Sequence, residues 1–183
     1  MSAQLRIREA TRADVAPIFS LIAGLAAYER APEQVTGTEE LLAQALFGAQ
    51  PAAEALIAEL GSDPDAQAGT RAAGAGTTAG FALFFPTFST WECRPGIWLE
   101  DLYVVPEHRR GGVGKALMTH LGALALQRGC ARLEWSALDW NTPALEFYEQ
   151  LGARRLEKWR MHRLDGEALA RVARMVGRQD LGR

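Results

Sequence analysis

The chain has 183 residues, a length that favours one domain with a hydrophobic core large enough to fold without disulfides or metal. Its formal net charge of -2 provides no basic field that would attract DNA or RNA. The two cysteines lack metal-ligand spacing, and neither a signal core nor a membrane-length apolar run is present. We therefore expect a cytoplasmic protein that acts on a small molecule, without metal, nucleic acid or membrane.

The N-terminal part of the chain predicts one strand and two helices. Hydrophobic alternation over residues 5–8 predicts the strand. Thr11, with Asp14 three residues later, makes a capping-box-like start for a helix that continues to about Arg30. Thr38 is placed to cap a second helix, because two glutamates and then a leucine-rich run follow it.

Two neighbouring strands are predicted next, over residues 55–60 and 80–85. The intervening residues 61–79 are dominated by Gly, Ala, Thr, Asp and Pro and have no apolar periodicity. We expect them to form a long mobile hairpin loop.

Strands and helices then alternate. Strands are predicted over residues 97–105, 132–138 and 154–164, and helices over residues 112–128, 142–151 and 167–176, the last with Asp165 as its cap. This order predicts an α/β fold in one domain, with a mixed central sheet and helices on both faces.

The most informative segment is the glycine-rich turn that follows the apolar run 97–105, because main-chain N–H groups at the start of a helix hold phosphate. A Walker A loop is excluded, since Arg109 and Ala116 replace its first glycine and its hydroxyl. A dinucleotide fingerprint from Gly112 fails at Leu117. An Arg-x-x-Gly-x-Gly motif starting at Arg109 remains, although the turn by itself is also compatible with a purely structural role.

Further motifs accompany this turn, in this order along the chain: Tyr28-Glu29, Leu99-Glu100-Asp101, the turn itself, Trp140-Asn141-x-Pro143, Phe147-Tyr148 and Leu151-Gly152-Ala153. Together they resemble the diamine acetyltransferases of the GNAT superfamily, of the spermidine/spermine N1-acetyltransferase type, and their thialysine-acetylating relatives. The resemblance implies the GNAT fold, a homodimer, and direct transfer of an acetyl group from acetyl-CoA to a primary amine.

The same resemblance identifies residues for the cofactor. Main-chain N–H groups of the turn would donate hydrogen bonds to the pyrophosphate, which would lie at the positive end of the following helix. The strand before the turn would open away from its neighbour, so that its main chain pairs with the pantetheine arm and the thioester carbonyl. The implied cofactor-binding residues are Leu102, Tyr103, Val104, Arg109, Arg110, Gly111, Gly112, Val113, Gly114, Lys115, Asn141, Thr142, Pro143 and Ala144.

Two catalytic residues are implied as well. Tyr148 matches the family's catalytic tyrosine and would protonate the leaving thiolate, although its spacing alone also suits a core position. Glu100 would accept the proton of the amine, which arrives protonated because its pKa is roughly 10. Asp101 should face the other side of the pleat.

The implied substrate-binding residues are Tyr28, Glu29, Glu100, Glu134, Trp135 and Ser136, whose carboxylates would attract a cationic chain. Arg30 would oppose a long polycation, which favours a shorter amine such as thialysine or lysine. Two other functions stay open: a protein or peptide N-acetyltransferase, and an acyl-CoA-binding module without catalysis.

Overall fold

The computed structural model describes residues 4–61 and 76–175. These residues form two compact units, the first ending at Ser136 and the second beginning at Ala137. The expectation of one domain stays a prediction. Among the described helices, none combines the length and the apolar composition needed to cross a bilayer.

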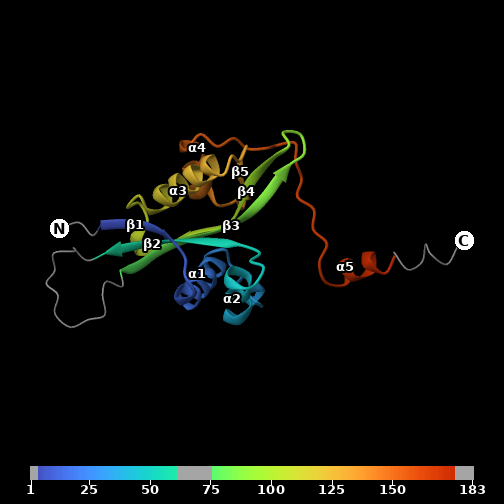
Figure 1. Ribbon diagram of the computed structural model, residues 1–183, viewed down its shortest axis with the longest axis horizontal. Coiled ribbons are helices and arrows are strands. Elements are labelled where there is room, and N and C mark those ends of the chain that lie inside the picture. The colour runs from blue at the N-terminus through green and yellow to red at the C-terminus, as the bar shows by residue number, and fades with distance from the viewer. Residues whose placement is uncertain (1–3, 62–75, 176–183) are drawn as a thin grey trace, which may run out of the picture. The chain divides into compact units, whose positions relative to one another are not determined.

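The first unit contains a five-stranded sheet (Figure 1). Its strands are β1 (Gln4–Glu9), β2 (Glu54–Gly61), β3 (Thr77–Ser89), β4 (Arg94–Val104) and β5 (Leu133–Trp135). They lie in chain order: β1 to β4 pair antiparallel, and β5 pairs parallel to β4. The predicted mixed sheet is therefore confirmed.

Helices cover both faces of this sheet, as predicted. Helices α1 (Val15–Tyr28) and α2 (Glu39–Phe47) lie on one face and α3 (Val113–Gln127) on the other (Figure 1). The core on the α1 side is formed by Ile18, Leu46, Ala55, Ile57, Phe81 and Tyr103. Each large apolar side chain buried in this way contributes about 1.5–3 kcal/mol to folding.

The predicted helix starts are confirmed in detail. A 3-10 turn, η1 (Arg12–Asp14), precedes α1, and the N–H of Thr11 donates to Asp14 Oδ2 at 2.7 Å. Thr38 Oγ1 accepts the N–H of Leu41 at 3.3 Å and caps α2. Local side-chain chemistry fixes both ends, which is why the sequence alone could locate them.

The expected loop between β2 and β3 is shorter than predicted at its C-terminal end. Thr77 and Thr78 pair with Leu60 and Glu59, so β3 begins inside the segment that composition had indicated as loop. Two β-branched threonines favour the extended conformation despite their polar surroundings. The remainder of that prediction, residues 62–75, lies outside the described residues.

The second unit contains α4 (Thr142–Gln150) and α5 (Gly166–Ala173). The strand predicted over residues 154–164 is wrong: these residues are exposed and in neither a strand nor a helix. Strand composition is present, but a strand requires a hydrogen-bonded neighbour, and the described chain supplies none here. Asp165 occupies the N-cap position of α5 as predicted, without a side-chain capping bond.

Candidate active site

A β-bulge interrupts β4 at the segment where the sequence predicts the site. Leu83 pairs with Asp101 and the next residue, Phe84, pairs with Leu99, so Glu100 is the extra residue in β4. Directly paired residues of antiparallel strands share a face of the sheet, and a bulge breaks the alternation between neighbouring residues.

The bulge brings Trp98, Glu100 and Asp101 to one side of the sheet. Asp101 pairs with Leu83, which packs against the core on the α1 side, and Trp98 pairs with Phe85 two residues further along β3. The indole Nε1 of Trp98 donates to Glu100 Oε2 at 2.8 Å, which places the Glu100 carboxylate on this side too. The expectation that Asp101 faces away from Glu100 is therefore wrong, because the pleat is not regular here.

Asp101 is the most perturbed carboxyl in this group. Burial, followed by the negative charges of Glu100 and Glu29, raises its pKa to about 6. Glu29, at the end of α1, also has a raised pKa because it is partly buried. A carboxyl with a pKa of about 6, as Asp101 has, is suited to accepting a proton near neutral pH.

The predicted residue Tyr28 lies under Arg109. The guanidinium carbon of Arg109 is 4.6 Å from the centre of the Tyr28 ring and 5.5 Å from that of Tyr103. Arg109 Nε also donates to the main-chain oxygen of Val104 at 3.0 Å. The Arg109 side chain therefore reaches the end of α1, where the sequence analysis places acceptor-binding residues.

The edge of β4 that faces β5 extends beyond its neighbour. Pairing with β5 begins at Ile97 and ends at Leu99, opposite Trp135, whereas β4 continues to Val104. The predicted cofactor residues Leu102, Tyr103 and Val104 therefore lie on a strand whose neighbour has already ended. An extended, amide-bearing ligand can pair with such an edge in the way that a further strand would.

The turn after β4 has the backbone of an anion-binding loop. Arg110 and Gly112 adopt left-handed conformations, with φ of 62° and 83°. Gly112 is the N-cap of α3 and offers no side chain to cap it, so the first-turn N–H groups of the helix are directed outward. Together with the helix dipole and Lys115 they suit a bound phosphate.

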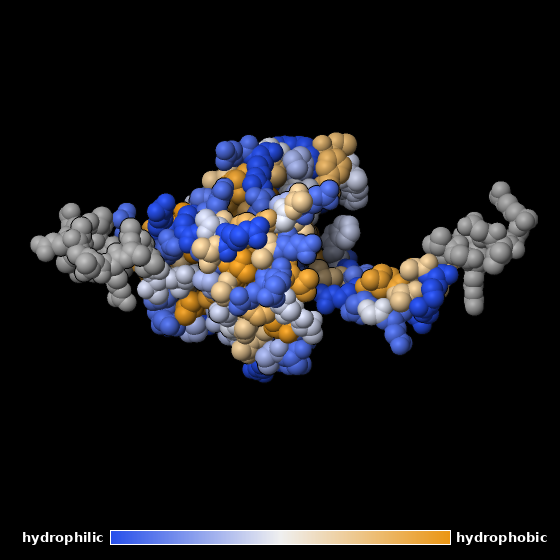
Figure 2. Space-filling view, turned by 60° about the horizontal axis from the view of Figure 1, so that its bottom comes forward, coloured by the Kyte–Doolittle hydropathy of each residue, from blue (hydrophilic) through white to orange (hydrophobic). Residues whose placement is uncertain are grey.

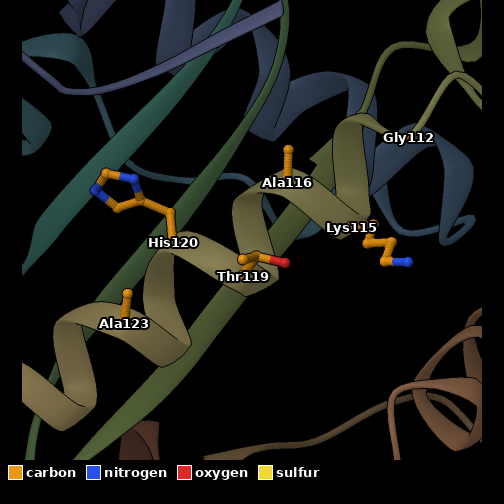
Figure 3. A pocket seen from close by; sticks show the side chains of 6 residues that line it. All are labelled: Gly112, Lys115, Ala116, Thr119, His120 and Ala123. Carbon is orange, nitrogen blue, oxygen red and sulfur yellow. The ribbon is translucent and has the colours of Figure 1, made fainter.

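A hollow of about 500 Å³ runs along the exposed side of α3 (Figure 3), lined by Gly112, Lys115, Ala116, Thr119, His120 and Ala123. These residues recur every three or four positions and so share one side of the helix. Sequence reasoning identified Gly112 and Lys115 but missed Thr119 and His120, which the same helical spacing could have indicated. It also missed Trp98.

The three substrate-binding residues predicted on β5 do not share one side. Glu134 pairs with Trp98, whereas Trp135 pairs with Leu99 on the opposite face. Glu134 bridges Arg132 at 2.7 Å. Ser136 follows the end of the strand. Of the two residues that lie within β5, only Glu134 is therefore on the same face as the carboxylates of β4.

The remaining predicted residues lie in the second unit. Asn141 Oδ1 accepts the N–H of Ala144 at 3.4 Å and caps α4, with Pro143 in the first turn. The rings of Tyr148 and Phe147 are 5.3 Å apart on the same helix. Because Glu100 belongs to the first unit and Tyr148 to the second, their approach in one working site stays a prediction.

Comparison with known proteins gives a consistent result. A family model described as acetyltransferase (GNAT) family matches residues 29–153. Thialysine N-epsilon-acetyltransferase of Bos taurus is 38% identical over 170 residues, covering 91% of this chain and 96% of the relative. L-ornithine N5-acetyltransferase of Arabidopsis thaliana is 31% identical over 201 residues, covering 93% and 88%.

Solved structures show the same fold at lower identity. An integron cassette protein from the mobile metagenome of V. cholerae has a TM-score of 0.71 and 24% identity, covering 94% of this chain and 98% of that one. An aminoglycoside acetyltransferase from an uncultured soil metagenomic sample has a TM-score of 0.68 and 19% identity, covering 88% and 97%.

Proposed function

Because this chain belongs to the acetyltransferase (GNAT) family, we propose that it transfers an acetyl group from acetyl-CoA to the primary amine of a small molecule. The family identifies the chain as an acetyltransferase and implies acetyl-CoA as its co-substrate. The observation that carries the proposal for the acceptor is the bulge in β4. It gathers Glu100 and Asp101 on the face that Glu29 approaches, next to the open strand edge.

The residues of the first unit fit coenzyme A. The diphosphate matches the outward N–H groups at the start of α3 and the left-handed turn formed by Arg110 and Gly112. The amides of the pantetheine arm match the edge of β4 beyond Leu99. Lys115 and the hollow along α3 leave space for the rest of the molecule.

The proposed chemistry is a direct attack by the neutral amine on the thioester carbon. Main-chain N–H groups of β4 would polarise the thioester carbonyl, an effect worth several kcal/mol in other enzymes. Tyr148 would donate its phenolic proton to the departing sulfur. The resemblance supports both roles, and the second requires the two units to meet.

The carboxylate pair would take the proton that the amine must lose. Asp101 is the member of the pair whose pKa lies near 6, so it is ionised at neutral pH and still basic enough to take part in proton transfer. Glu100, held by the indole of Trp98, would bind the incoming ammonium group. This divides between two residues a role that the sequence analysis gave to Glu100 alone.

For the acceptor we propose a short diamine-like amino acid. Two relatives are named for thialysine and for L-ornithine, which both carry a terminal primary amine. The carboxylates of Glu29, Glu100, Asp101 and Glu134 suit one such cation, whereas Arg30, beside Glu29, disfavours a longer polycation.

We also propose a homodimer, in line with the resemblance. Several large apolar side chains of the second unit are exposed in the single chain: Leu156, Trp159, Met161, Leu164, Leu169, Val172 and Met175. Figure 2 shows apolar side chains exposed on the surface. Such a density of exposed apolar groups suits contact with a second copy. Sedimentation velocity on the purified protein would test this, and a monomer at micromolar concentration would contradict it.

The experiment that tests the function is thiol release from acetyl-CoA with a panel of thialysine, L-ornithine, lysine, spermidine and short peptides. Tyr148→Phe should bind coenzyme A normally in calorimetry and lose at least about tenfold in turnover. A peptide as the best acceptor would favour a protein acetyltransferase. Coenzyme binding without turnover on any amine would favour a non-catalytic module.

A further inference from the structure

Arg109 lies between two parts of the proposed site. It follows η3 (Pro106–His108) and opens the glycine-rich turn, so its position in the motif suggests a phosphate ligand. Its side chain instead extends over the rings of Tyr28, at the end of α1, and Tyr103, on β4. One guanidinium therefore joins the turn, the strand and the helix end.

These contacts fix the guanidinium in direction as well as position. Nε donates to the Val104 carbonyl at 3.0 Å, so the plane of the group is tied to the last residue of β4. Aromatic rings attract a cation over their faces, and the Tyr28 distance of 4.6 Å is well inside the range of that attraction. Arginine suits this arrangement better than lysine, because its flat group stacks on a ring and donates from its edge at the same time.

Tyr103 is itself held in place on the α1 side. It is buried in the core cluster, and a side chain added at Gly24 of α1 would meet its hydroxyl at 3.1 Å. Tyr103 also shares a face of β4 with Asp101, two residues earlier. The surface on which Arg109 rests is therefore continuous with the proton-accepting carboxylate.

We propose that Arg109 is a positioning residue for the acceptor amine: it clamps Tyr28 and the end of α1 against β4. This inference rests on the proposed function. The neighbouring Arg110, exposed and in the left-handed turn, serves the diphosphate instead. Of the two adjacent arginines, Arg109 thus serves the acceptor amine and Arg110 serves coenzyme A.

Arg109→Gln and Arg110→Gln form a matched pair of variants for the test. With thialysine as acceptor, Arg109→Gln should raise the KM for the amine about fivefold, as loss of a cation–π contact predicts, and change the Kd of coenzyme A less than twofold. Arg110→Gln should weaken coenzyme A binding and leave the KM for thialysine unchanged. Equal loss of coenzyme A affinity in the two variants would overturn the proposal.

Conservative variants separate clamping from charge. Arg109→Lys keeps the charge but not the flat group, so it should behave like Arg109→Gln. Tyr28→Leu removes the ring, so it should raise the KM for thialysine and add nothing in the Arg109→Gln background. Additive effects of Tyr28→Leu and Arg109→Gln would contradict the clamp.

A measurement without turnover keeps this inference separate from the proposed function. Amide hydrogen exchange at residues 26–31 should accelerate in Arg109→Gln and not in Arg110→Gln, with or without coenzyme A. If the wild-type chain acetylates no amine, the function fails while the exchange result still tests the clamp. Unchanged exchange in Arg109→Gln would reject the clamp even in an active enzyme.

Discussion

Trp98 donates a 2.8 Å hydrogen bond from its indole nitrogen to the carboxylate of Glu100, two residues further along β4. We expect Trp98→Phe to keep the ring but leave the carboxylate unanchored. Because a hydrogen bond to a charged group is worth about 1.5–3 kcal/mol, kcat/KM for the amine should fall about tenfold. Steady-state kinetics with thialysine would measure this, and calorimetry should show unchanged affinity for coenzyme A.

Trp91 provides the control for that variant. It lies in the turn between β3 and β4 and is 89% exposed, away from the carboxylates. Trp91→Phe should therefore leave kcat/KM within about twofold of wild type, since an exposed surface substitution changes little. An equal loss in both variants would indicate a general effect of removing tryptophan from this hairpin.

The dependence of kcat/KM on pH should show the ionisation of Asp101. Its pKa of about 6 predicts that kcat/KM rises as pH increases through 6, because the ionised form is the one that accepts a proton. Above pH 6 the profile should level off, because the bound ammonium group can then give its proton to the enzyme. In Asp101→Asn the rate should be lower and should keep rising toward the amine's pKa of roughly 10. Identical profiles for the two proteins would remove Asp101 from proton transfer.

Asp101 should also reduce the stability of the fold. Its folded pKa of about 6 exceeds the unfolded value of roughly 4, so the free energy of unfolding falls as pH rises from about 4 to about 6. Asp101→Asn should therefore be more stable than wild type at pH 7.5, by an amount of the order of 1–2 kcal/mol. Urea unfolding at pH 7.5 and pH 4.5 would show the gain shrinking at the lower pH. A destabilised variant at pH 7.5 would contradict this.

Helix ends and buried strands were predictable because short segments of sequence determine them. The first two helices begin where Thr11, Asp14 and Thr38 offer capping oxygens, and residues 97–105, apolar except at Glu100 and Asp101, indicated a strand. The mixed sheet followed from the order of these elements. The family followed from motifs spread over much of the chain, which the family model confirms.

The details of the site were not predictable in the same way. The bulge at Glu100 depends on its pairing with β3, and nothing in Leu99-Glu100-Asp101 indicates an extra residue. The contact between Arg109 and Tyr28 joins residues that are far apart in the sequence. The strand expected over residues 154–164 failed for a related reason, since strand formation depends on a partner that the pattern does not contain.

Gly80 should be intolerant of any side chain because β3 and β4 approach closely there. A Cβ at this position would lie 2.5 Å from the Tyr103 carbonyl oxygen and 3.2 Å from Val104 Cα, both main-chain atoms of β4. Gly80→Ala should destabilise the fold by about 2 kcal/mol or more and weaken coenzyme A binding.

Gly122→Ala is the control: the space is open there, and alanine in a helix should stabilise the fold by about 0.5–1 kcal/mol. Thermal unfolding would compare the stability of the two variants. Unchanged stability of Gly80→Ala would show that β3 and β4 can move apart there without loss of stability.

Asp14 should make the free energy of unfolding depend on pH under acidic conditions. Its side chain is 9% exposed and pairs with Arg8 at 2.7 Å, and this bond holds its pKa down to about 2. Since the unfolded value is roughly 4, the contribution of Asp14 is complete above pH 4 and is lost as pH falls from 4 toward 2. Asp14→Asn should therefore cost about 2 kcal/mol at pH 7, and the difference from wild type should narrow below pH 4. The exposed Glu39, the first residue of α2, gives the comparison, because Glu39→Gln should change the free energy of unfolding by less than about 0.5 kcal/mol. A deficit for Asp14→Asn that stays constant down to pH 2.5 would show that the ion pair with Arg8 is not its source.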